Sequence, residues 1–178
     1  MAGKSFSVRI FLQDGHADGV LVVAKSSWPG RALVLPRASY AVEGQRKELD
    51  APGVYVLVGS SAEGGLQSIY IGAAAPVCRD LQRHYEQNGF WRRAVVFTSK
   101  GDSLNRTQVQ YLAAHLLRLA KEVNVARINN RARLRSPRLS EADLAEAEAF
   151  LAGMLSIIPL LGLPAFEKSN IENTFKSI

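Results

Sequence analysis

The chain has 178 residues, 47% of them hydrophobic, with one cysteine and a formal charge of +6 at pH 7. This length and composition favour a folded domain with its own core, and the single cysteine excludes an internal disulfide and offers no zinc-binding or iron–sulfur spacing. The excess of basic residues favours a polyanionic partner only where those residues gather on one face.

The first 50 residues are typical of short strands joined by turns. An alternating pattern covers residues 7–12, and two β-rich runs follow at 20–23 and 32–35. Asp-Gly pairs at positions 14 and 18 mark turns after the first strand. We therefore expect a small antiparallel β-meander in this region.

Two strand-like tripeptides come next, Gly53-Val54-Tyr55 and Tyr70-Ile71-Gly72, on either side of a glycine-rich loop at 59–65. A loop of this composition predicts a hairpin. Residues 76–87 then predict a helix, and residues 94–98 predict a third strand of the same sheet.

A long helix is predicted beyond this strand. Asn105 is a suitable N-cap, and apolar residues recur at helical spacing from Val109 to Ala120. Such a helix is expected to pack on the sheet. A short strand at 123–128 and an irregular, arginine-rich segment at 131–138 follow.

The C-terminal part predicts one more helix and a loose polar tail after Glu167. Ser140, with Asp143 three residues later, begins an amphipathic helix that runs through Leu155. Its apolar residues suit packing on the chain's own sheet, which we favour, or on a second copy, so a homodimer stays open. No apolar run approaches membrane-spanning length and no signal-peptide core follows Met1, so we expect a cytoplasmic protein with no membrane partner.

The paired tripeptides resemble the signature of the GIY-YIG nucleases, in which two tyrosines lie side by side on neighbouring strands. Later residues match the family's order, with His84 on the first helix, Phe90-Trp91 leading the next strand, Tyr111-Leu112 before a glutamate position, and then Asn130. The similarity to one bacterial branch of the family extends over nearly the whole chain, to about Phe166.

The resemblance implies an α/β fold in which a small antiparallel or mixed GIY-YIG-like sheet is flanked by helices. We expect three regions along the chain. They are an N-terminal β-meander over 1–50, a nuclease-like domain over 51–135, and a C-terminal packing helix with its tail over 136–178.

The resemblance also implies a mechanism for an intact member of the family. The first tyrosine deprotonates water, Mg²⁺ or Mn²⁺ bound by the glutamate stabilises the leaving oxygen, and the arginine offsets charge on the phosphate. The catalytic positions implied for this chain are Tyr55, Tyr70, Arg79, His84 and Asn130.

Two positions depart from the family pattern. The family arginine is Asp80 here, and Arg79 lies one residue early, which rotates it by about 100° on a helix. The metal-binding glutamate is Ala113, whose methyl group cannot bind a metal. Because each lost group commonly costs about two to three orders of magnitude in rate, the resemblance implies a catalytically impaired site with no metal.

Other interpretations stay open. Ala113 is either natural or an introduced change, and Asp80 is a candidate ligand for a relocated metal, with Arg79 supplying positive charge. The two tyrosines also suit ordinary cross-strand packing, His84 suits a solvated helix face, and Asn130 suits a turn cap.

The preferred function is binding of nucleic acid, with DNA as the expected partner, through a nuclease-derived cleft whose catalysis is weak or absent. The alternatives are a metal-dependent endonuclease that hydrolyses phosphodiester bonds and a protein-interaction module on the retained scaffold. Basic side chains beside such a cleft neutralise phosphates through counterion release. The candidates are Arg92, Arg93, Lys100, Arg127, Arg131, Arg133 and Arg135.

Overall fold

The computed structural model describes residues 3–60 and 65–168 and contains a mixed seven-stranded sheet flanked by helices, which confirms the predicted α/β fold. The strand order is β1-β2-β3-β6-β4-β5-β7. Neighbouring strands are antiparallel except β5 and β7, which are parallel. The strands are β1 (Val8–Leu12), β2 (Leu21–Lys25), β3 (Gly30–Pro36), β4 (Gly53–Ser60), β5 (Gln67–Ala74), β6 (Arg93–Ser99) and β7 (Ala126–Ile128).

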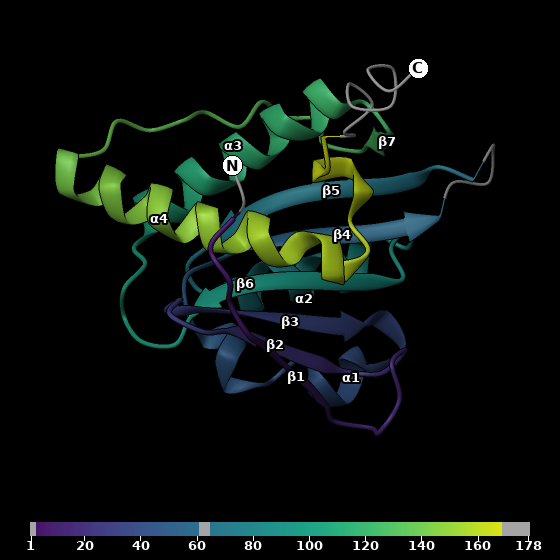
Figure 1. The fold of residues 1–178 in the computed structure, drawn as a ribbon. Coiled ribbons are helices and arrows are strands. Elements are labelled where there is room, and N and C mark those ends of the chain that lie inside the picture. Colours follow the sequence, from purple (N-terminus) through teal and green to yellow (C-terminus); the bar gives the residue numbers. More distant parts are fainter. Residues whose placement is uncertain (1–2, 61–64, 169–178) are drawn as a thin grey trace, which may run out of the picture.

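Helices cover both faces of this sheet (Figure 1). The α-helices of the described residues are α1 (Tyr40–Glu43), α2 (Val77–Gln87), α3 (Arg106–Val123) and α4 (Glu141–Ile157). Short 3-10 helices are η1 (Arg37–Ser39), η2 (Lys47–Asp50), η3 (Ile158–Leu161) and η4 (Pro164–Phe166).

Each face of the sheet has its own hydrophobic core, because successive residues of a strand point to opposite sides. Val54 and Val56 of β4 belong to the core that α3 and α4 cover. Tyr55 and Leu57 belong to the other core, which contains Leu81 of α2. The first tyrosine of the signature therefore lies on the α2 face.

The N-terminal meander continues the sheet of the signature strands. β3 pairs with β6 along its length, from Gly30 opposite Ser99 to Pro36 opposite Arg93. The predicted hairpin of β4 and β5 is present, with residues 61–64 of its loop outside the described residues. The predicted loose tail lies outside them from residue 169 onward.

The predicted helix starts are confirmed by their caps. The Asn105 side chain accepts from the backbone N–H of Gln108 at 2.8 Å, and the Gln108 side chain accepts from the backbone N–H of Asn105 at 3.0 Å. The Ser140 hydroxyl accepts from the backbone N–H of Asp143 at 3.1 Å. Both helices thus begin where a side chain satisfies a free backbone donor.

The C-terminal helix packs on its own sheet, as predicted. Phe150, Met154 and Ile157 of α4 are buried in the core that also contains Val54. The segment Glu141–Leu161 has the length and mean hydropathy (1.7) of a membrane-spanning helix, which corrects the expectation that no such run exists. A helix buried in a protein core meets the same criterion, and the packing of α4 accounts for its apolar residues.

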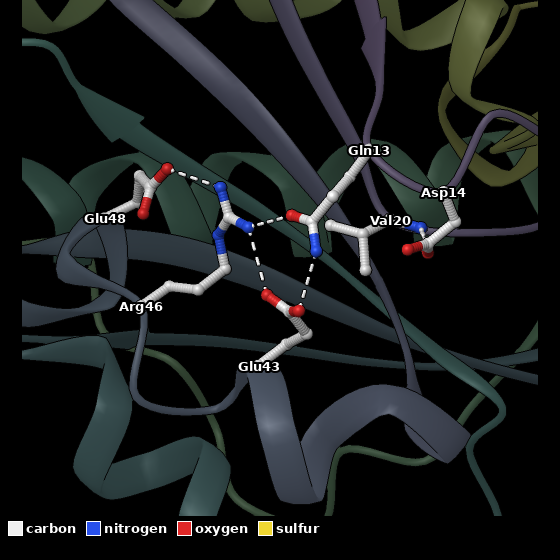
Figure 2. Close-up of polar contacts among 6 residues, drawn as sticks. All are labelled: Gln13, Asp14, Val20, Glu43, Arg46 and Glu48. Carbon is white, nitrogen blue, oxygen red and sulfur yellow. Dashed lines mark hydrogen bonds and ion pairs between the residues drawn. The ribbon is translucent and has the colours of Figure 1, made fainter.

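A polar network attaches the end of β1 to the segment between β3 and β4 (Figure 2). The Arg46 guanidinium donates to Gln13, to Glu43 at 3.0 Å and to Glu48 at 2.8 Å. The Gln13 amide donates to Glu43 at 2.7 Å. Since these side chains are partly buried, the network fixes the first turn of the meander more firmly than exposed ion pairs would.

Candidate functional site

The strand register brings the two signature tyrosines together. Tyr55 lies opposite Gly72, and Leu57 lies opposite Tyr70, so both tyrosines point to the α2 face. Their rings are 6.3 Å apart between centroids and inclined by 23°. The two phenols thus share one site, as the sequence analysis expected.

The glycine of the second tripeptide is required by the Tyr55 ring. A Cβ atom at Gly72 would lie 2.3 Å from the Tyr55 ring and its hydroxyl, closer than real side chains approach. At Gly53, a Cβ atom would lie 2.7 Å from the Phe97 carbonyl oxygen. Both glycines therefore serve close packing, and Gly72 lets the Tyr55 ring lie directly over β5.

His84 on α2 is buried against both tyrosines, with 4% of its surface exposed, rather than on a solvated face. Its Nδ1 accepts from the Asn88 side-chain amide at 2.7 Å, because an amide nitrogen only donates. The neutral imidazole then carries its proton on Nε2, which donates to the Tyr55 hydroxyl at 3.1 Å. The His84 ring also lies 4.6 Å from the Tyr70 ring.

Asp80 completes a chain of polar contacts along α2. The Tyr55 hydroxyl donates to Asp80 Oδ2 at 3.0 Å, and the Arg83 guanidinium lies 3.3 Å from Asp80 Oδ1. Residues three and four apart share one face of a helix, which places Asp80, Arg83 and His84 together. Arg83 was missed by the sequence analysis; its spacing from Asp80 was the available signal.

Burial controls the protonation of the two tyrosines and of His84 in this series of polar contacts. It raises the pKa of the Tyr55 phenol, and the neighbouring Asp80 carboxylate raises it further. Burial also raises the pKa of Tyr70. It lowers the pKa of His84, as does the positive charge of Arg83, while Asp80 acts in the opposite direction. At neutral pH, both phenols are therefore protonated and His84 is neutral.

The structure does not bring Arg79 or Ala113 to the tyrosines. Arg79 is exposed and lines a separate hollow with Tyr40 and Cys78, so its one-residue displacement turns it away as expected. Ala113 is 1% exposed and packs in the α3 core, on the opposite side of the sheet from Tyr55. A longer side chain at position 113 would begin in that core.

Asn130 has a structural role beside the site. Its side-chain amide donates to the Ile71 carbonyl at 2.8 Å, and its side-chain oxygen accepts from the Ile71 N–H at 2.9 Å. Asn129 donates its backbone N–H to the Ile69 carbonyl at 2.7 Å. These bonds extend the pairing of β5 beyond β7 and hold the following segment against the tyrosine site.

A groove of about 710 Å³ opens between α2 and the segment after β7. Tyr70 and His84 line it from the tyrosine site. Three arginines from two parts of the chain also line it: Arg83, Arg127 and Arg131. The groove thus combines fixed aromatic groups with positive charge.

The other predicted basic residues do not line this groove. The Arg93 guanidinium donates to the Leu161 and Gly162 carbonyls, at 2.8 Å each, and burial lowers its pKa. Arg92 and Arg93 line a different, largely apolar hollow. Lys100, Arg133 and Arg135 are exposed elsewhere. Arg93 is therefore occupied in holding η3 rather than available to a phosphate.

The divalent metal that the resemblance implies does not fit the residues present. Both oxygens of Asp80 are engaged, one by the Tyr55 hydroxyl and one by the Arg83 guanidinium. Across residues 3–60 and 65–168, no group of three or more His, Cys, Asp or Glu residues is placed to hold a metal ion. A cation at Asp80 would lie close to the positive charge of the Arg83 guanidinium.

Comparison of the chain with protein-family models, with curated proteins and with solved structures found no match.

The lowered pKa of His84 predicts a pH-dependent stability. In the unfolded chain the imidazole titrates near 6.5, so below that pH the unfolded state binds a proton that the folded site resists, and stability falls as pH falls. His84→Gln removes this contribution. We expect the stability difference between the native chain and His84→Gln, measured by urea unfolding, to shrink from pH 7.5 to pH 5.5. A difference independent of pH would contradict the burial of a neutral imidazole.

Proposed function

We propose that this chain binds nucleic acid, with DNA as the expected partner, through the arginine-lined groove beside Tyr70 and His84. The observation that carries the proposal is that Arg127 and Arg131 line one groove together with Arg83, whose charge Asp80 partly offsets. Guanidinium groups bind phosphate oxygens with two parallel hydrogen bonds and stay charged at all relevant pH values. One arginine comes from α2 and two come from β7 and the residues after it, so a nucleic-acid backbone passing between these elements could contact both sides.

The fixed groups of the groove support a ligand with flat, polar components. Tyr70 is half-buried, and its ring is held against His84 and Tyr55. Aromatic rings held in this way can stack on bases, while arginines neutralise the backbone. This combination favours nucleic acid over a simple anion.

The same geometry favours binding over hydrolysis. The Tyr55 phenol is buried and donates its proton to Asp80, and its pKa is raised, so it is a poor base for activating water. The Asp80 carboxylate lies beside Arg83 of the groove, so it partly offsets the charge of Arg83 and would repel a phosphate bound there. We therefore propose that any catalysis by this site is weak or absent.

Removing the two arginines after α3 tests the groove. We expect Arg127→Gln with Arg131→Gln to weaken binding of a short DNA duplex at least tenfold at low salt. The slope of log affinity against log salt should fall by about two, because two phosphate contacts are lost. Fluorescence anisotropy over a salt series measures both quantities, with single-stranded DNA and RNA as further ligands.

The control for this variant is Lys4→Gln with Lys47→Gln, which removes the same charge from exposed residues that do not line the groove. Equal losses in the two double variants would mean that net charge alone drives binding. Affinity that is absent at low salt, together with co-purification of a protein, would favour an interaction module instead.

Asp80 is predicted to weaken nucleic-acid binding. Asp80→Asn keeps an acceptor for the Tyr55 hydroxyl, removes the negative charge and frees Arg83 for a phosphate. We expect affinity for the same duplex to rise several-fold, whereas Asp102→Asn at an exposed position should change it little. Unchanged affinity in Asp80→Asn would show that the ligand does not approach α2.

The endonuclease alternative is tested by nicking of plasmid DNA in Mg²⁺ or Mn²⁺. We expect no cleavage above that of Tyr70→Phe, prepared in parallel to reveal contaminating nuclease. We also expect Ala113→Glu with Asp80→Arg to stay inactive and to unfold at lower temperature, since position 113 lies in the α3 core. Gln110→Glu, on the exposed side of α3, is the stability control. Cleavage by this double variant would support the alternative that the site is a recently disabled nuclease.

A further inference from the structure

The first strand of the sheet is an edge with unusually exposed apolar residues. β1 pairs with β2 and stands at the end of the strand order (Figure 1). Ile10, Phe11 and Leu12 are 42%, 59% and 38% exposed. Its sequence has no proline and one charge, Arg9, so it carries few of the devices that protect edge strands from pairing.

The backbone of β1 presents a regular row of unpaired groups. The Ser7 carbonyl accepts from Ser26 at 2.9 Å, and the Gln13 N–H donates to Val20 at 3.0 Å. The backbone N–H and C=O groups of the odd-numbered residues of β1 therefore point toward β2 in this register. The N–H and C=O groups of Val8, Ile10 and Leu12 consequently point away from the sheet.

We propose that two copies of this chain pair through β1, antiparallel about a two-fold axis at Ile10, so that their sheets become one. Ile10 then faces Ile10 of the second copy, and Val8 faces its Leu12. Each such pair exchanges two hydrogen bonds, which gives about six across the axis. A two-fold arrangement closes on itself and uses the same strand from both copies.

The side chains of β1 are complementary to themselves in this register. Arg9 lies opposite Phe11 of the second copy, in the non-hydrogen-bonded type of pair whose side chains approach most closely. A guanidinium over an aromatic ring is favourable, and the two copies of Arg9 do not face each other. A register shifted by one residue would lose the symmetric match of Val8 with Leu12. This self-complementarity is what favours a second copy over an unrelated strand.

The structure also holds β1 in a fixed geometry before any partner arrives. Gln13, which directly follows β1, is hydrogen-bonded through its side chain to Arg46 and Glu43 (Figure 2). The Asp14 side chain accepts from the Val20 N–H at 3.2 Å, which stabilises the turn into β2. Less conformational freedom is then lost on association.

Apolar surface continues beside the proposed axis. Ile10 and Leu12 line a hollow with Leu21 of β2 and with Leu160, which is 56% exposed. Pairing through β1 would place the second copy's Ile10 and Leu12 on the same face and extend this surface. The arginine-lined groove is at β5 and β7, near the other end of the strand order, so it stays uncovered.

Sedimentation equilibrium of the full chain tests the pairing. We expect a native mass of twice 19.4 kDa at concentrations of tens of micromolar. Phe11→Arg sets two arginines opposite each other and should give a monomer, and adding Arg9→Glu should restore the dimer through two Arg–Glu pairs. Val42→Arg, at a position 81% exposed on α1, should leave the dimer intact.

Every outcome of this series is decisive. A native monomer at 100 µM, a dimer insensitive to Phe11→Arg, or larger open assemblies would each overturn the proposal. Circular dichroism of Phe11→Arg separates loss of pairing from loss of folding. Independently, Ile10→Cys in a Cys78→Ser background should form a disulfide-linked dimer under mild oxidation, whereas Val42→Cys should not; equal cross-linking of the two would also overturn it.

Discussion

The packing of the Tyr55 ring over Gly72 determines the rest of the site. The absence of a side chain at Gly72 allows the ring to lie against β5, beneath α2. The hydroxyl then lies between Asp80 and His84, which are one helical turn apart on α2. Because the phenol is buried, each of its two hydrogen bonds must be satisfied by the protein, and a polar chain from Asn88 to Arg83 results.

This series of hydrogen bonds explains why Tyr55 stays protonated in the site. A buried phenol that donates to a carboxylate is stabilised in its protonated form, and so is the neutral imidazole beside it. Asp80 accepts the hydrogen bond of the Tyr55 hydroxyl and is also the counterion of Arg83. Asp80 thus partly offsets Arg83 within the site, and under the proposed function Arg127 and Arg131 are the groove arginines that would meet a phosphate.

The sequence was informative where local physics decides the outcome. The strands, the capped starts at Asn105 and Ser140, and the shared face of the two tyrosines follow from alternation, capping and pairing, and the structure contains each of them. It was less informative about the side chains around them. Asn130 and Arg93 carry the right chemistry for binding, but backbone carbonyls far along the chain engage both, and no sequence pattern encodes those partners.

The part of β5 beyond β7 and the edge strand β1 contrast in how their free backbone groups are satisfied. Beyond β7, the Asn130 side chain occupies both the N–H and the C=O of Ile71, as a further strand residue would. At β1, three residues present these groups to solvent beside exposed apolar side chains. Water can satisfy the backbone groups at β1 but not the apolar surface next to them. The fold satisfies the part of β5 that extends beyond β7 with a single amide, but it leaves β1 with free backbone groups beside apolar side chains. An edge of this kind is more consistent with one that another strand covers.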